Sequence, residues 1–113
     1  VISGTGFWFL MEKNTPHYDL AVVKAEVIRR GKEAFTRYAL ETGRDMGMSW
    51  KVMMQVVATL ERRMLYKSMT SYSNHRNWHD VYHVSFRNRE IYIKVTYCTS
   101  GGSPVISFKE KNT

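Results

Sequence analysis

The spacing of apolar residues changes near residue 64, from a helical repeat to an alternation of apolar and polar positions. From Asp19 to about Gly31 apolar residues recur every three or four positions, which indicates an amphipathic helix. Aspartate commonly caps the start of a helix, and glycine commonly follows its end. We therefore predict a helix between these residues, with an apolar stripe made of Leu20, Val23, Val27 and Ile28.

Two more helices are predicted before the spacing changes. One has Thr36 as its cap, runs to about Met46 and ends near Gly47. The next begins at Ser49 and carries a stripe of large apolar residues, namely Trp50, Met53, Met54, Val57 and Leu60. Methionine at helical spacing usually fills gaps in packing, so this stripe is predicted to lie in the core.

The second half of the chain has the alternation of β-strands. Between Glu90 and Cys98, one side of the predicted strand is apolar and the other carries Tyr92, Lys94 and Thr96. A similar row, Tyr82, Val84 and Phe86, precedes it, and a last strand runs from Val105 to about Lys109. Three consecutive antiparallel strands after three helices predict an α+β fold, in which the N-terminal helices pack on one face of a C-terminal sheet.

The length and composition predict one folded domain. The chain has 113 residues, of which 43% are hydrophobic and 13% aromatic, enough for one core but not for a second. Residues 1–10 are interpreted as an N-terminal extension, because Met11-Glu12-Lys13 resembles a natural beginning. Residues 11–113 are predicted to form the domain.

The charge favours a polyanionic partner. Seventeen Lys and Arg against ten Asp and Glu give a net charge of +7, which suits phosphate groups, so nucleic acid is the first partner to consider. We expect no membrane partner, because no stretch is long or apolar enough to span a bilayer. With one cysteine and no signal peptide, the chain is expected to work in a reducing cytoplasm.

Metal-free RNA cleavage needs few kinds of side chain. One group accepts a proton from the ribose 2′-oxygen, another protonates the leaving oxygen, and cations stabilise the phosphorane. Lys67 and Lys109 are candidates for the cations. Tyr92 lies on the polar side of its strand, but a phenol titrates near 10 and needs nearby ammonium groups, whereas His79 titrates near neutral pH. By residue type alone, surface lysines and strand tyrosines more often have only solvating or packing roles.

Longer strings of residues point to a family. The string Tyr66-Lys67-Ser68-Met69-Thr70, followed by Trp78-His79-Asp80-Val81-Tyr82 and closed by Ser107-Phe108-Lys109-Glu110-Lys111, resembles the MqsR family of toxin endoribonucleases. The resemblance starts at Met11-Glu12-Lys13-Asn14-Thr15-Pro16-His17 and covers nearly the whole chain after Leu10. It implies a RelE-like α+β fold and ribosome-independent cleavage of single-stranded mRNA at short GC-containing sites. It also implies an inhibitory MqsA-type antitoxin as partner, and no metal or small-molecule cofactor is expected.

The resemblance also assigns roles to residues. The family's active-site lysines fall on Lys67 and Lys109, its tyrosine on Tyr92 and its neighbouring methionine on Met69. At position 79 this chain departs from the family's glutamine, so His79 could carry a proton or make the same hydrogen bond to RNA. Other candidates for substrate contacts are Lys94 and three aromatic residues that could stack on bases, Tyr72, Trp78 and Tyr82. Trp78 is four residues from Tyr82, and for Trp78 burial beside that tyrosine is the favoured interpretation.

Three other functions are consistent with parts of the sequence. His75, His79 and His83 recur every four residues and on a helix would form a metal site, although the alternation near His83 indicates a strand. The basic surface could also belong to a small RNA- or DNA-binding module without catalysis. Alternatively, the lysines could only keep a structural or partner-binding protein in solution. A nuclease would release fragments with a 5′-hydroxyl, whereas a binding module would leave RNA intact.

Overall fold

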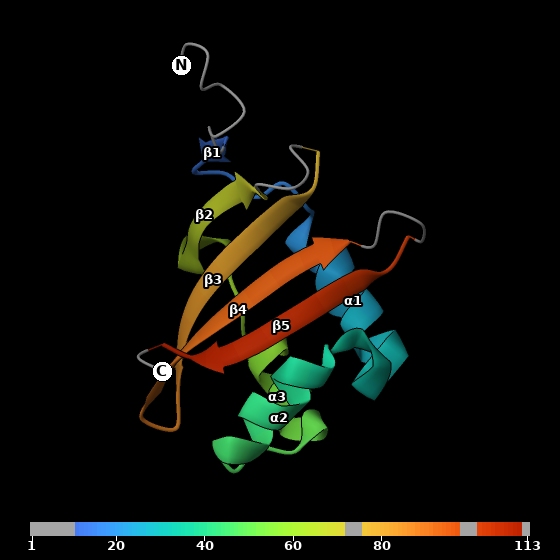
Figure 1. Cartoon of the computed structure of the whole chain (residues 1–113), viewed down its shortest axis with the longest axis vertical. Helices are drawn as coiled ribbons and strands as arrows, with labels where there is room; N and C mark the ends of the chain where they lie inside the picture. The colour runs from blue at the N-terminus through green and yellow to red at the C-terminus, as the bar shows by residue number, and fades with distance from the viewer. Residues whose placement is uncertain (1–10, 72–75, 98–101, 112–113) are drawn as a thin grey trace.

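The computed structural model describes residues 11–71, 76–97 and 102–111. Its helices are α1 (Leu20–Arg30), α2 (Arg37–Asp45) and α3 (Trp50–Ala58), with short 3-10 turns at η2 (Gly31–Ala34) and η3 (Arg62–Met64). The strands are β1 (Glu12–Lys13), β2 (Leu65–Thr70), β3 (Trp78–Phe86), β4 (Arg89–Tyr97) and β5 (Pro104–Glu110). They form one antiparallel five-stranded sheet in chain order, as Figure 1 shows. The predicted α+β fold is confirmed.

Each predicted helix begins at its predicted cap. The side chains of Asp19, Thr36 and Ser49 accept hydrogen bonds from backbone N–H groups in the first turns of α1, α2 and α3. Such bonds satisfy donors that a helix leaves unpaired at its start. Gly31 follows α1 with a φ of 64°, a conformation in which glycine carries no steric penalty. None of the helices in the described residues is long and apolar enough to cross a membrane.

The sheet has more strands than the three predicted. Strand β3 begins at Trp78, earlier than expected, and β2 was not predicted as a strand. A shift of register between Leu65 and Lys67 interrupts the alternation in β2, and this bulge hides the strand in the sequence. Strand β1 is only two residues long and forms by pairing with β2, so it has no periodicity of its own.

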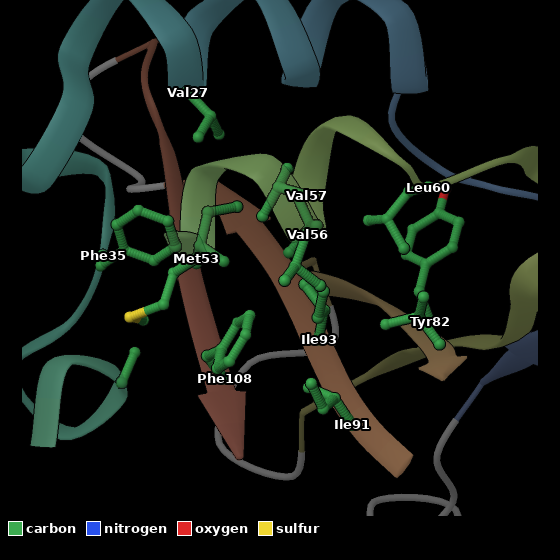
Figure 2. Packing of buried hydrophobic residues seen from close by; sticks show 14 of the residues in the cluster. Val27, Phe35, Met53, Val56, Val57, Leu60, Tyr82, Ile91, Ile93 and Phe108 are labelled. Carbon is green, nitrogen blue, oxygen red and sulfur yellow. The ribbon is translucent and has the colours of Figure 1, made fainter. Parts of the chain in front are cut away.

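The core lies between the helices and one face of the sheet (Figure 2). Its largest fully buried members include Met53 and Leu60 from the helical half, and Ile93 and Phe108 from the strands. Met53, Val57 and Leu60 confirm the predicted stripe, whereas Trp50 and Met54 are only half-buried. Ile28 was expected on the apolar side of α1 but is exposed.

Helix α2 is attached to the outer strand β5. The backbone N–H of Thr36 donates to the carbonyl oxygen of Ile106 at 3.0 Å, and the hydroxyl of Thr42 donates to that of Phe108. These bonds occupy backbone acceptors on an edge strand, where unpaired groups would otherwise face solvent. They also fix the first turn of α2 beside β5 and leave the opposite face of the sheet open.

Candidate active site on the open face of the sheet

The face of the sheet away from the helices is polar and half-exposed. Buried residues alternate along the strands with side chains that point to this open face, which is made of Lys67, Met69, His79, Val81, His83, Tyr92, Lys94, Ser107 and Lys109. The register places Lys67 opposite Val81, Val81 opposite Lys94, and Lys94 opposite Ser107. Segments far apart in the chain thus form a continuous row across four strands.

A second row contains three stacked rings. His83 pairs with Tyr92, and its imidazole lies between two phenol rings, with centroid distances of 4.5 Å to Tyr66 and 4.3 Å to Tyr92. Both pairs are nearly parallel, at 16°. We call Tyr66, His83 and Tyr92 the ring column. Its members come from three adjacent strands, so the packing of the sheet fixes their order.

The two predicted lysines lie at opposite ends of the ring column. The Nζ of Lys67 is 4.9 Å from the centroid of the Tyr66 ring, and the Nζ of Lys109 is 5.9 Å from that of Tyr92. Ammonium groups at such distances are attracted by the ring faces. The structure therefore brings Lys109 next to Tyr92, whereas the column separates Lys67 from them.

A pocket with a volume of about 430 Å³ opens on this face. Such a volume is within the range of small-ligand sites. The open-face pocket is lined by Tyr38, Tyr66, Met69, Val81, His83, Tyr92, Lys94, Ser107, Phe108 and Lys109. Four residues predicted from the sequence, Met69, Tyr92, Lys94 and Lys109, therefore share one cavity.

Lys67 is held by a carboxylate that the sequence did not identify. Its Nζ donates a hydrogen bond to Oε2 of Glu12 at 3.2 Å, and this bond raises the pKa of Lys67. Glu12 is in β1 opposite Met69, so the pairing of β1 with β2 brings this carboxylate to the open face. The ammonium group of Lys67 is therefore charged at neutral pH.

His79 lies next to the pocket without lining it. It pairs with Met69, and its Nδ1 is buried without a hydrogen-bond partner in the described structure. Burial lowers the pKa of His79, and the charge of Lys94 lowers it further. His79 is therefore mainly neutral at pH 7.

His83 is a site residue that the sequence suggested only as a possible metal ligand. It lines the pocket, its Nε2 is buried without a described partner, and burial followed by the charge of Lys111 lowers its pKa. The signal was available, since alternation places it on the same side of the strand as His79. The helix that the alternative metal site would need does not form at His79 and His83, because both are in β3, while His75 lies outside the described residues. Within the described residues no group of three His, Cys, Asp or Glu side chains could hold a metal ion.

The three residues predicted to stack on bases differ in where they lie. The prediction that Tyr82 stacks on RNA bases is wrong, because Tyr82 lies in the core with 1% of its surface exposed. Burial there raises its pKa to about 12. Tyr72 lies outside the described residues. Trp78 is half-buried, and instead of packing on Tyr82 its ring stacks on His17, with a centroid distance of 4.9 Å and an angle of 13°.

Comparisons with known proteins agree with the resemblance seen in the sequence. A model of the protein family described as "Motility quorum-sensing regulator, toxin of MqsA" matches residues 15–110. The mRNA interferase toxin MqsR of Escherichia coli (strain K12) is 38% identical over 101 residues, which cover 89% of this chain and 100% of the relative. The family match extends over the strands that carry the ring column and the lysines. The chain therefore belongs to the MqsR toxin family.

Proposed function

We propose that the protein is the toxin of a type II toxin-antitoxin system and cleaves single-stranded mRNA at specific sequences, independently of the ribosome. The name of the Escherichia coli relative, an mRNA interferase toxin, supports this function. The observation that carries it is the ring column, which has an ammonium group at each end and borders a 430 Å³ pocket. Cations next to groups that can exchange protons are what cleavage of a phosphodiester requires.

The proposed chemistry is metal-free. The ribose 2′-oxygen bonds to phosphorus, the bond from phosphorus to the 5′-oxygen breaks, and the products are a 2′,3′-cyclic phosphate and a 5′-hydroxyl. Lys109 stabilises the negative charge of the phosphorane from inside the pocket, whereas Lys67, at the far end of the ring column, is assigned to a neighbouring phosphate of the RNA and not to the same phosphorane. Both act as compact charges that are most effective where water is partly excluded.

Tyr92 is the proposed proton carrier in the pocket. It lies between His83 and Lys109, so its hydroxyl can exchange a proton next to the cation that stabilises the phosphorane. His79 is assigned a hydrogen bond to RNA or the second proton transfer, and Met69 shapes the pocket beside it. Lys94 is assigned to a phosphate, because it is exposed and lines the same pocket.

We further propose that an MqsA-type antitoxin inhibits the protein, and that both act in the cytoplasm. The family description, which calls its members toxins of MqsA, supports this partner. Co-expression is the direct test: a stable complex that no longer cleaves RNA is the expected result. An antitoxin that co-purifies without reducing cleavage would contradict inhibition.

The test of the activity combines growth with product analysis. Expression is expected to arrest growth and to release RNA fragments with a 5′-hydroxyl, and antitoxin should relieve the arrest. Lys67→Ala, Tyr92→Phe and Lys109→Ala should each relieve it while the protein stays folded. Lys51→Ala is the matched control, because Lys51 is exposed on α3, in the helical layer. Toxicity that persists through all three changes would remove the site assignment, and RNA that is bound but left intact would favour a binding module.

A further inference from the structure

Tyr38 is an aromatic residue in the open-face pocket that does not belong to the sheet. It is in the first turn of α2, yet it lines the same cavity as Tyr92, Lys94 and Lys109. Its side chain is 54% exposed, so the ring is accessible to a ligand in the pocket. Exposed and next to the phosphate-binding lysines, it is placed to meet a ligand and contributes little to the core.

The position of Tyr38 is fixed by the attachment of α2 to β5. Thr36, two residues before it, caps the helix and donates its backbone N–H to Ile106, while Thr42 donates to Phe108 one turn later. A ring on a helix bound at both turns needs little ordering when a ligand arrives, so less entropy is lost on binding. Tyr38 thus forms a fixed wall at the β5 side of the pocket.

The ring column alone leaves a base few surfaces for stacking. The two faces of His83 are covered by Tyr66 and Tyr92, and each end of the column has a lysine near its outer ring. Single-stranded RNA is usually bound through its backbone and through bases stacked on aromatic side chains. A ring outside the column, close to Lys94 and Lys109, supplies the surface that the column lacks.

We propose that Tyr38 stacks on a nucleobase of the RNA next to the cleaved bond, so that the binding site extends from the sheet onto α2. This inference rests on the proposed function, since it takes the open-face pocket as the place of cleavage. Stacking is tolerant of base identity, because every base has an aromatic face. Tyr38 therefore adds affinity, and it fixes where the chain of nucleotides crosses β5.

The first experiment separates binding from chemistry. With a single-stranded RNA oligonucleotide, Tyr38→Ala should raise KM roughly tenfold, the effect of losing one stacking contact between a base and an aromatic ring. It should leave kcat nearly unchanged. Tyr38→Phe should restore KM, because stacking needs the ring and not the hydroxyl. Ile28→Ala is the control, since Ile28 is 59% exposed on α1 and is not part of the pocket. An unchanged KM in Tyr38→Ala would overturn the inference.

A second experiment identifies the base. Oligonucleotides that each lack one base, and that carry 2′-O-methyl groups so that no 2′-hydroxyl can attack phosphorus, are bound to the wild type and to Tyr38→Ala, and affinity is measured by fluorescence anisotropy. At the position that Tyr38 contacts, removing the base should weaken the wild type and cause no further loss in Tyr38→Ala. Additive losses at every position would overturn the inference. Because this measurement needs no cleavage, RNA that is bound but not cut would refute the proposed nuclease and still test Tyr38.

Discussion

Each histidine in the described part of the chain is accompanied by a lysine. Burial is the main cause that lowers the pKa of His17, His79 and His83, and the charges of Lys13, Lys94 and Lys111, respectively, lower them further. The imidazoles are therefore mainly neutral at pH 7, and the positive potential of the open face comes mainly from ammonium groups. A neutral imidazole can still accept a hydrogen bond or a proton.

The position of His79 favours its role as a hydrogen-bond partner of RNA. It does not line the pocket, and one of its ring nitrogens is buried. We expect His79→Gln to keep most of the wild-type kcat/KM, since an amide can make a similar hydrogen bond, whereas His79→Ala should lose about tenfold. Cleavage rates of the two variants, measured from pH 6 to 8, check this. A loss above about a hundredfold in His79→Gln would make His79 a proton carrier.

The same three histidines make the fold less stable in acid. Their pKa values are below the ordinary value of 6.5, so the unfolded chain binds more protons than the folded protein just below that pH. The free energy of unfolding should have its full value above about pH 7. It should decrease as the pH drops through 6.5 toward the lowered pKa values. Urea midpoints at pH 7.5, 6.5 and 5.5 test this, and His83→Gln should make the fall shallower. A midpoint that rises in acid would contradict it.

At the scale of elements, Asp80 joins the N-terminal segment to the sheet. Its carboxylate in β3 is 1% exposed and accepts hydrogen bonds from the backbone N–H groups of His17 at 3.0 Å and Tyr18 at 2.9 Å, and from the hydroxyl of Ser68 at 2.6 Å. Buried donors need such partners, and a charged acceptor forms stronger bonds than a neutral one. The segment that carries Glu12 toward Lys67 is thereby anchored beside β2 and β3.

Asp80→Asn is therefore expected to destabilise the protein by about 3 kcal/mol. The amide cannot accept all of these hydrogen bonds, and its NH₂ group would face other hydrogen-bond donors. Urea unfolding gives the change directly. Asp45→Asn serves as the control, since Asp45 is exposed at the end of α2 and should change stability by less than about 0.5 kcal/mol. A decrease of less than about 1 kcal/mol in the free energy of unfolding for Asp80→Asn would show that the hydrogen bonds to Asp80 contribute little to stability.

The elements predicted from the sequence are those with local signals. Caps at Asp19, Thr36 and Ser49 and long regular periods define helices without reference to the rest of the fold. Strand β2 was missed because its bulge breaks the period, and Tyr38 was missed because its link to the site is a tertiary contact between layers. Tyr82 was assigned to RNA by its aromatic type, although the row it shares with Val84 already indicated the core face.

At the scale of the whole molecule, the folded sheet brings to one face lysines that are far apart in the sequence. Lys67, Lys94 and Lys109 come from three strands, and the alternation of side chains turns all three to the open face. The composition predicted a polyanionic partner but not a surface, because the net charge of +7 is the same wherever the lysines lie. Only the register of the strands places Lys94 and Lys109 in one pocket and Lys67 on the same face, at the far end of the ring column.

This arrangement predicts how binding depends on salt. Each phosphate of a single strand that a cation neutralises contributes about 0.7 to the slope of log affinity against log salt. In a Tyr92→Phe background that slows cleavage, Lys94→Ala and Lys109→Ala should each reduce the slope by about 0.7, and the double variant by about 1.4. Lys51→Ala should leave it unchanged, because Lys51 is on α3 in the helical layer. Equal reductions of the slope in all three single variants would mean that RNA is attracted by net charge alone. That result would contradict the open face as the binding surface.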